Sequence, residues 1–302
     1  MELNSFQEKM RHFLPEIELR FAEPMSRHTS LRIGGPAEVM AFPQNPQELA
    51  HILKVTKELD ITCAILGAGT NILAPDEGCR GLIICLKDCL GGMELLPGNC
   101  IRVMAGVTMA RAAVFAANHG LSGLEFAHGI PGTVGGGVYM NAGAYGGEMS
   151  GICRSVTLMD GAGQLREVNA RELEFSYRHS KLQESGEIVI SAVLQLQPAA
   201  PEEIKQKMRE LQAKRLASQP LDYPSAGSAF KRPAGGYAAA LIDQAGLRGF
   251  QVGQAAIAQK HAGFAINLGG ATAAEMRELL TQVSDRVFRQ TGIRLEPEIR
   301  IW

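Results

Sequence analysis

The sequence predicts a mixed α and β protein with two compact domains, and three observations support this prediction. From about residue 30, short apolar segments of strand length alternate with segments whose apolar residues recur at helical spacing, which is typical of an α/β or α+β unit. Prolines and alanines at 198–201 interrupt this pattern before a polar helix. The chain has 302 residues, which is enough for two domains of ordinary size.

The elements of the first half follow in order. Residues 1–26 are expected to form a leader helix with acidic and basic side chains on its surface. Asn45 is expected to cap a helix, since Pro46 fits the first helical position and Glu48 fits the first turn. Thr108 is expected to cap a second helix of small residues. Strands are expected at 62–66, 81–86, 101–105, 155–160 and 188–197.

The second half divides at the interruption near residue 198. Residues 27–198 are expected to form the first domain and residues 199–302 the second, smaller one. In the second domain, Thr272 and Glu275 predict a capping box, and apolar residues then continue at helical spacing as far as Gly292. Strands are expected at 252–258, 263–268 and 295–302.

Composition excludes several classes of function. Apolar residues make up 46% of the chain and charged residues 20%, so a packed core is expected rather than extended disorder. The net charge is −1 and no basic residues interleave with aromatic ones, so no nucleic-acid partner is expected. No segment suits a membrane span and the start lacks a signal-peptide pattern, so we expect a cytoplasmic protein with reduced cysteines and no membrane association. The six cysteines lack paired C-x-x-C spacing, so no metal site is expected.

The first predicted binding segment directly follows a strand and reads Leu66-Gly67-Ala68-Gly69-Thr70-Asn71. Its glycines allow a backbone nest whose amides can bind a pyrophosphate, so all six residues are candidates for cofactor binding. A Rossmann motif with Asp88 as the ribose partner is an alternative. Ile72 disfavours it by occupying the place of the third small residue, and Pro75 disfavours it by lying where the helix should begin. A Gly-x-Gly turn is also often structural, so this segment alone leaves phosphate binding open.

Glycine is far denser in residues 129–147, where it fills nearly half of the positions in a chain with 34 glycines. Such density costs backbone entropy, and close approach of the main chain to a ligand would offset that cost. A P-loop is excluded because no Gly-Lys-Ser/Thr follows, whereas a set of tight structural turns remains the alternative. Two glycine-rich segments suggest a large charged ligand such as a dinucleotide. The candidates here are Gly129, Ile130, Pro131, Gly132, Thr133, Gly135, Gly136, Asn141, Ala142, Gly143 and Ala144.

Three later segments contain further candidates. Arg178 stands beside aromatic residues and could clamp a carboxylate, although an exposed loop arginine would fit the same pattern. Ser228 lies in a small-residue loop without a neighbouring histidine or a Gly-x-Ser-x-Gly elbow, which disfavours a hydrolase nucleophile. Glu298 and Arg300 lie two apart in the predicted C-terminal strand and so share a face, as an ordinary surface ion pair also would.

Taken together and in this order, these segments resemble the UDP-N-acetylenolpyruvoylglucosamine reductase (MurB) family of bacterial cell-wall synthesis. The resemblance runs from about Arg27 to the last residue. Its motifs are His-Thr-Ser-Leu-Arg-Ile-Gly-Gly at 28–35, Gly-Ala-Gly-Thr-Asn at 67–71, the glycine-rich segment 129–147, Tyr-Arg-His-Ser at 177–180, Pro-Ser-Ala-Gly-Ser-Ala-Phe-Lys at 224–231 and Glu-Pro-Glu-Ile-Arg at 296–300. The order of these motifs argues against chance agreement.

The resemblance implies an α+β fold in which an FAD-binding domain of the vanillyl-alcohol-oxidase type precedes a smaller α+β substrate-binding domain. It implies FAD as cofactor and NADPH as electron donor, whereas the residues alone did not choose between FAD and NAD. The implied reaction reduces the enolpyruvyl double bond of UDP-N-acetylglucosamine enolpyruvate, with the hydride coming from the flavin. Residue by residue, Arg178 matches the family's active-site arginine, Ser228 its proton donor and Glu298 its C-terminal acid.

The resemblance also suggests further substrate contacts, for which solvated surface charge is the alternative. The candidates are Tyr177, Lys214, Arg215, Gln219, Lys231, Lys260, His261 and Arg300. Of these, Lys231 is also the candidate for easing proton loss from Ser228. The chain resembles the family's shorter branch, which lacks a loop with a substrate-capping tyrosine, and it has Gly137 in place of the usual alanine. A non-catalytic flavoprotein or nucleotide-sugar-binding module is a further alternative, and no obligate protein partner is expected.

Overall fold

The computed structural model describes residues 2–302, which divide into two compact units. Unit 1 comprises the chain up to Phe21, Val39–Ala68 and Gly81–Ala213. Unit 2 comprises Ala22–Glu38, Gly69–Arg80 and Lys214–Trp302. The chain therefore passes into unit 2 three times.

This division does not coincide with the boundaries expected at 26/27 and 198/199. The first two passages into unit 2 lie largely within the segment assigned from sequence to the first domain. Helix α6 (Pro201–Ser218) runs across the last division, between Ala213 and Lys214. Local composition marks where an element is interrupted, but it does not reveal which distant segments pack together.

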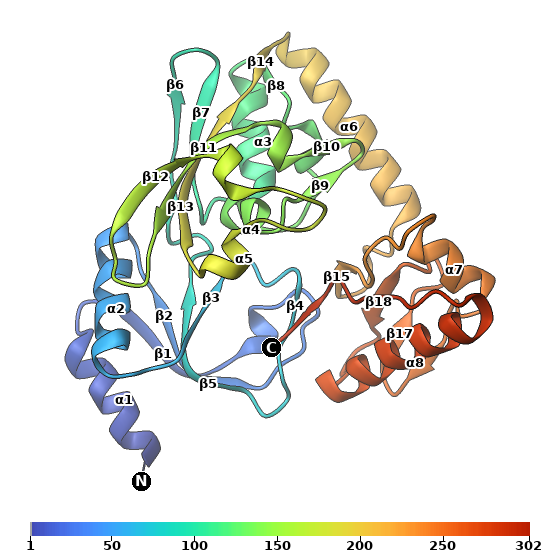
Figure 1. The fold of residues 1–302 in the computed structure, drawn as a ribbon, viewed down its shortest axis with the longest axis horizontal. Coiled ribbons are helices and arrows are strands. Elements are labelled where there is room, and N and C mark those ends of the chain that lie inside the picture. The colour runs from blue at the N-terminus through green and yellow to red at the C-terminus, as the bar shows by residue number, and fades with distance from the viewer. Residues whose placement is uncertain (1) are drawn as a thin grey trace. The chain divides into compact units, whose positions relative to one another are not determined.

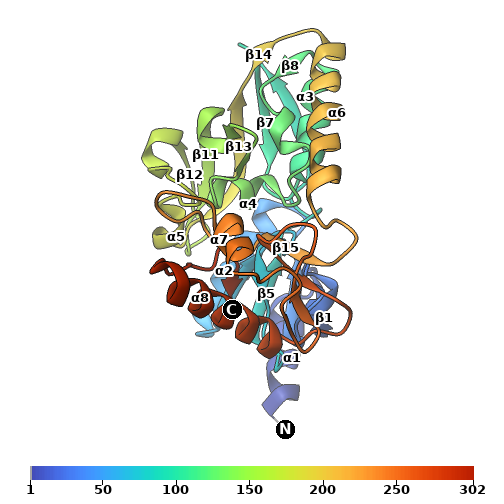
Figure 2. The ribbon, with the colours of Figure 1, turned by 90° about the vertical axis from the view of Figure 1, so that its right-hand side faces the viewer.

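A five-stranded antiparallel sheet with the order β12-β11-β13-β7-β6 forms the centre of unit 1 (Figure 1). Its core also includes residues of α3 (Met109–Asn118), α4 (Val134–Tyr139) and the first part of α6. Figures 1 and 2 both show α3 and α6 side by side along this sheet. The strands are β6 (Met93–Leu96), β7 (Cys100–Met104), β11 (Cys153–Met159), β12 (Leu165–Asn169) and β13 (Ile188–Gln195).

A second sheet has the order β1-β2-β5-β3, and the division between the units cuts three of its strands. The strands are β1 (Glu18–Pro24), β2 (Pro36–Phe42), β3 (Cys63–Leu66) and β5 (Cys79–Cys85). Helix α2 (Pro46–Glu58) packs in the same hydrophobic core as this sheet, to which it contributes Leu49 and Ile52. Asn45 caps α2 as predicted, since its Oδ1 accepts a hydrogen bond from the Glu48 amide at 2.9 Å.

The predicted leader helix is too long. Helix α1 spans Glu2–Phe13, and residues Glu18–Pro24 form strand β1 instead. In the segment Glu18-Leu19-Arg20-Phe21, charged and apolar residues alternate with a period of two. This period matches the two faces of a strand and not the spacing of a helix.

Unit 2 contains a four-stranded antiparallel sheet with the order β15-β18-β17-β16. Helix α8 (Ala273–Thr291) packs against it through an apolar face that includes Met276 and Leu279, and α7 (Ala238–Gln244) joins the same core. The predicted capping box of Thr272 and Glu275 is confirmed. The strands are β15 (Ser225–Ser228), β16 (Gln251–Val252), β17 (Ala255–Ile257) and β18 (Phe264–Asn267).

The remaining elements are short: β4 (Ile72–Leu73), β8 (Leu121–Ser122), β9 (Gly143–Ala144), β10 (Gly147–Glu148), β14 (Gln197–Pro198), β19 (Arg300–Ile301), α5 (Leu182–Ser185), and the 3-10 helices η1 (Met25–Arg27), η2 (Glu125–Ala127), η3 (Met149–Gly151) and η4 (Ala170–Leu173). Of the strand predicted at 295–302, only the two residues of β19 form a strand, and they pair in parallel with β4. None of the helices within residues 2–302 has the length and apolar character needed to cross a membrane.

Candidate active site

The two glycine-rich segments meet within unit 1. Gly67 follows Leu66, the buried last residue of β3, and a Cβ at Gly67 would lie 2.7 Å from Thr133 Oγ1. Within residues 2–302, the main-chain amides of Gly67, Ala68 and Thr133 donate no hydrogen bond to protein. Unused amides on adjoining turns form the kind of nest that binds phosphate oxygens.

The next residues of the first turn belong to unit 2 and are held by main-chain packing. Gly69 has φ 60°, and a Cβ there would lie 1.9 Å from the carbonyl oxygen of His28, so only glycine fits. Thr70 follows in the same turn, half-buried, and Asn71 Nδ2 donates to Glu298 O at 3.1 Å. The chain then enters β4 and not a helix, so the turn lacks the helix N-terminus that the Rossmann alternative requires.

Most of the dense glycine segment forms helix α4 and its flanking turns. Thr133 caps α4, since its Oγ1 accepts from the Gly136 amide at 3.3 Å. The Gly135 amide donates to Ala105 O at 2.9 Å. The amides expected to serve a ligand at Gly135 and Gly136 are therefore already engaged within the protein.

The glycines of α4 differ in what surrounds them. A Cβ at Gly135 would lie 2.9 Å from Ala105 Cβ, and one at Gly137 would lie 2.8 Å from Met109 Sδ. Close packing against neighbouring elements therefore explains both of these glycines. At Gly136 the nearest atom to a Cβ would be Thr133 Oγ1, at 3.5 Å. This part of the helix surface is bare, as a site for a flat or extended ligand would require.

The other candidates of this segment lie in the loop before α4 and in the turn after it. The Ile130 amide donates to Ala127 O at 3.0 Å, and Gly132, with φ 138°, accepts at its carbonyl from the Met109 amide at 3.0 Å. Gly129 and Pro131 lie in the same loop. Ala142, Gly143 and Ala144 follow α4, and the last two residues form β9, paired with β10.

Asn141 is engaged with the main chain at both ends of its side-chain amide. It is 1% exposed, its Nδ2 donates to Ser176 O at 3.0 Å, and its Oδ1 accepts from the Ser150 amide at 2.9 Å. This side chain, a cofactor-binding candidate from the sequence, therefore spends hydrogen bonds on the protein itself. Asn141 fastens the turn that contains Arg178 to the end of α4.

Two buried polar atoms without hydrogen-bond partners lie next to the glycine-rich segments. Ser30 Oγ lies beside Gly69, because the Ser30 amide donates to Gly69 O at 3.0 Å, and His128 Nδ1 lies directly before Gly129. Buried polar groups are normally paired, so each atom is open to a polar partner such as a water molecule or a ligand atom. Within unit 1, the unused amides near Gly67 and the His128 ring nitrogen fit a pyrophosphate-containing cofactor such as FAD. Within residues 2–302, no cluster of side chains suits a metal ion.

Arg178 lies in a tight turn of unit 1. The turn is closed by two hydrogen bonds, from the Ser176 amide to His179 O at 3.1 Å and from the His179 amide to Ser176 O at 3.2 Å. Arg178 has φ 56°, its Nη2 donates to Gly143 O at 3.3 Å, and its guanidinium lies 5.2 Å from the ring centroid of Tyr177. The guanidinium is thus held beside the end of the glycine-rich segment.

Ser228 and Glu298 come together in unit 2, although they are 70 residues apart in sequence. The Glu298 amide donates to Ala229 O at 2.9 Å, and the Lys231 amide donates to Glu296 O at 2.9 Å. Ser228 ends β15 and is exposed, whereas Glu298 is half-buried. The pairing of these two short segments places a hydroxyl and a carboxyl group on adjacent stretches of main chain.

Several predicted substrate contacts have protein partners of their own. Lys231 forms an ion pair with Glu296, and Lys260 Nζ donates to Leu216 O at 2.6 Å, near the C-terminus of α6. Burial lowers the pKa of the His261 imidazole, so the neutral form is favoured. The other candidates lie on α6 (Lys214 and Arg215), just after it (Gln219), in the turn of Arg178 (Tyr177) and in β19 (Arg300).

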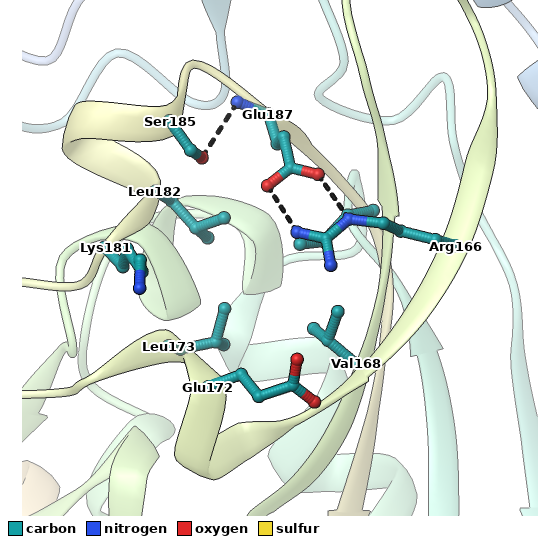
Figure 3. Close-up of a pocket in the computed structure, with 9 residues that line it drawn as sticks. Arg166, Val168, Glu172, Leu173, Lys181, Leu182, Ser185 and Glu187 are labelled. Atoms are coloured by element: carbon teal, nitrogen blue, oxygen red, sulfur yellow. Dashed lines mark hydrogen bonds and ion pairs between the residues drawn. The ribbon is translucent and has the colours of Figure 1, made fainter.

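Each unit also contains a cavity. In unit 1, a pocket of about 20 Å³ lies beside Arg166 and Glu187, whose side chains form two hydrogen bonds of 2.6 and 2.7 Å. Figure 3 shows the residues that line it. This volume suits a single water molecule, so the pocket has a structural character. In unit 2, a cavity of about 300 Å³ is lined by residues that include Tyr223, Gln251 and Lys260.

Known proteins match almost the whole chain. A family model described as the UDP-N-acetylenolpyruvoylglucosamine reductase C-terminal domain matches residues 219–302, and one described as an FAD binding domain matches residues 37–169. A UDP-N-acetylenolpyruvoylglucosamine reductase of Agathobacter rectalis is 44% identical over 98% of both chains. A protein of the same name from Streptococcus pneumoniae is 42% identical, also over 98% of both chains.

A solved structure agrees with these sequence matches. The crystal structure of UDP-N-acetylenolpyruvylglucosamine reductase (MurB) from Thermus caldophilus has 34% identity and a TM-score of 0.78, and the match covers 95% of this chain and 99% of that chain. This match and the FAD-binding model confirm the expected α+β fold with an FAD-binding domain. The chain belongs to the UDP-N-acetylenolpyruvoylglucosamine reductase family of FAD-dependent oxidoreductases.

Proposed function

We propose that this protein reduces the enolpyruvyl double bond of UDP-N-acetylglucosamine enolpyruvate, giving UDP-N-acetylmuramate, with FAD bound and NADPH as electron donor. The observation that carries the proposal is the attachment of the Arg178 turn to the glycine-rich segment of the FAD-binding unit. It provides a fixed guanidinium beside the expected cofactor site. When bound, FAD supplies the hydride chemistry, and the protein supplies position and charge.

Arg178 is proposed to bind the carboxylate of the enolpyruvyl group. Hydride addition pushes electron density onto this carboxylate, so the transition state carries more negative charge there than the substrate does. A guanidinium already in place stabilises this added charge, because no reorganisation is needed as the charge develops. Its hydrogen bond to Gly143 O supports one fixed direction for the group.

Ser228 is proposed to protonate the carbon next to the carboxylate, and Glu298 to donate a hydrogen bond to the enolic oxygen while protonated. The main-chain pairing near Ala229 supports a joint role for these two side chains. We propose a smaller contribution from Lys231 than the sequence suggested. Its ion pair with Glu296 offsets the effect of the ammonium charge on the acidity of the Ser228 hydroxyl.

The substitution Ser228→Ala tests the proposal, because it removes the proton donor and leaves the expected cofactor site intact. We expect reduction of the flavin by NADPH to be unchanged, and oxidation of the reduced flavin by the enolpyruvyl nucleotide to slow by about 100-fold or more. Anaerobic stopped-flow absorbance of the flavin measures both half-reactions separately. Ser218→Ala, at an exposed site at the end of α6, is the matched control.

Two results would contradict this assignment. Equal slowing of both half-reactions would show that Ser228 supports the fold or the cofactor and not proton transfer. A wild-type protein that takes up no FAD, or whose reduced flavin does not respond to the nucleotide, would reject the proposed reaction as a whole. The cytoplasmic location, the nucleotide-sugar contacts and the lack of an obligate protein partner stay predictions.

A further inference from the structure

Gln183 lies five residues after Arg178, in the short helix α5, and its side chain clamps two separate main-chain segments. Its Nε2 donates to Arg178 O at 3.1 Å and to Tyr139 O at 3.2 Å. A side-chain amide nitrogen has two hydrogens, so both donors of this group are used. The clamp joins the Arg178 turn to the end of α4.

Tyr139 O is an anchor that two side chains share. Tyr139 is the last residue of α4, where carbonyl oxygens lack partners within the helix. Besides the bond from Gln183, this oxygen accepts one from Ser180 Oγ at 2.7 Å, and Ser180 is fully buried. On the other side of the turn, Asn141 Nδ2 holds Ser176 O at 3.0 Å. Side chains before and after Arg178 therefore fasten the turn to α4.

The turn needs such fastening because its backbone is strained. Arg178 has φ 56°, a left-handed conformation that costs a residue with a side chain on the order of 1 kcal/mol. Strained backbone persists where the surroundings determine it more than once, and such places cluster at functional sites. The two bonds between Ser176 and His179 close the turn, but they do not set its direction relative to α4.

We propose that Gln183 is a positioning residue for the Arg178 guanidinium. It acts through the Arg178 carbonyl oxygen, by fixing the backbone from which the guanidinium extends toward Gly143 O. The inference rests on the proposed function, in which this guanidinium stabilises negative charge on the substrate. Displacing a catalytic group by about 1 Å can slow a reaction by about 100-fold, so loss of the clamp is expected to affect the half-reaction that uses Arg178.

Gln183→Met tests this inference, because methionine keeps the length of the side chain and removes both donors. We expect oxidation of the reduced flavin by UDP-N-acetylglucosamine enolpyruvate to slow by about tenfold or more, with flavin reduction by NADPH and FAD content unchanged. Gln206→Met is the matched control, since the exposed Gln206 side chain bonds to Arg209 and Glu210 of its own helix, α6. It is expected to leave both half-reactions unchanged.

Gln183→Glu adds a pH readout that a general loss of packing would not show. Ionised, the new carboxylate would face the carbonyl oxygens of Tyr139 and Arg178 and repel them. Protonated, it would donate one hydrogen bond and restore part of the clamp. The ratio of the variant's rate to the wild-type rate is therefore expected to rise as the pH is lowered, whereas the ratio for Gln183→Met is expected to stay flat.

A double substitution separates positioning from an independent role. If Gln183 acts through the Arg178 guanidinium, then Gln183→Met in an Arg178→Ala background should slow the reaction no further than Arg178→Ala alone. Additive slowing would overturn the inference. So would a wild-type rate in Gln183→Met, or a joint loss of FAD and of both half-reactions in the two Gln183 variants. If the wild-type flavin itself does not respond to the nucleotide, the proposed function fails, and this result is distinct from the others.

Discussion

Consecutive glycines at 135–137 look alike in the sequence, yet the structure gives them different surroundings. Gly135 and Gly137 face neighbouring atoms so closely that a Cβ would lie within 3 Å of them, whereas a Cβ at Gly136 would make only an ordinary contact with Thr133 Oγ1, at 3.5 Å. Two of the main-chain amides that were candidates for ligand binding bond to the protein instead. The Gly136 amide takes part in the cap of α4, and the Gly135 amide donates to Ala105 O. At the scale of a residue, a glycine can therefore serve either the packing of the protein or the approach of a ligand.

Alanine substitutions should separate these two uses. Gly136→Ala is expected to leave the FAD-free protein as stable or stabilise it by about 0.5–1 kcal/mol, because alanine favours a helix, while FAD binding weakens. Gly135→Ala is expected to destabilise the FAD-free protein by about 1–3 kcal/mol through overpacking against Ala105. Urea unfolding and FAD titration measure the two effects.

Gly151→Ala serves as the control, because a Cβ there would meet no atom within 4 Å. It is expected to change neither stability nor FAD affinity appreciably. If Gly136→Ala bound FAD as tightly as the wild type, the bare face of α4 would not be part of the cofactor site.

At the scale of an element, the sequence correctly predicted the helix starts at which a side chain caps its own helix. Asn45, Thr108 and Thr272 each cap the helix expected of them, because capping joins groups only a few residues apart. Strand β1 was missed although its alternation of charged and apolar residues was visible in the sequence. Helix α4 was also missed, because glycine has a low helix propensity and the helix depends on packing against Ala105 and Met109 as well as on its Thr133 cap.

The capping box of α8 provides a test at this scale. Thr272 Oγ1 accepts from the Glu275 amide at 3.1 Å, so Thr272→Ala is expected to lower the free energy of unfolding by about 1 kcal/mol. Thr272→Ser keeps the oxygen and should retain most of the stability. Denaturant unfolding of both variants measures the difference, and equal destabilisation by the two substitutions would contradict a capping role.

At the scale of the whole molecule, the chain alternates between two units, and each holds part of the proposed chemistry. Unit 1 contains Arg178 and most of the glycine-rich segments, and unit 2 contains Ser228 and Glu298. A cofactor that binds only the folded protein must stabilise it by mass action. The thermal stability of the whole protein is therefore expected to depend on FAD.

Removal of FAD should lower the thermal midpoint, and adding it back should restore the original value. At a free concentration about 100 times its Kd, a ligand of the folded state contributes about 2.7 kcal/mol. Differential scanning fluorimetry with FAD, and with FMN as a control that lacks the adenylate half and its pyrophosphate link, measures this effect. If the thermal unfolding midpoint did not change with added FAD, binding at the nest near Gly67 would be contradicted.

The sequence by itself determined the family, the mixed α and β character, helices α2, α3, α6 and α8, several strands of the larger sheets, and the candidate residues. These features depend on neighbouring residues or on short motifs in a fixed order, so they can be recognised without knowing which distant residues are in contact. Only the tertiary structure decided how the chain divides into units, that Gly67 lies against Thr133, and that Asn141 and Gln183 hold the Arg178 turn. These depend on hydrogen bonds and packing between segments far apart in the chain, which no local pattern of residues encodes.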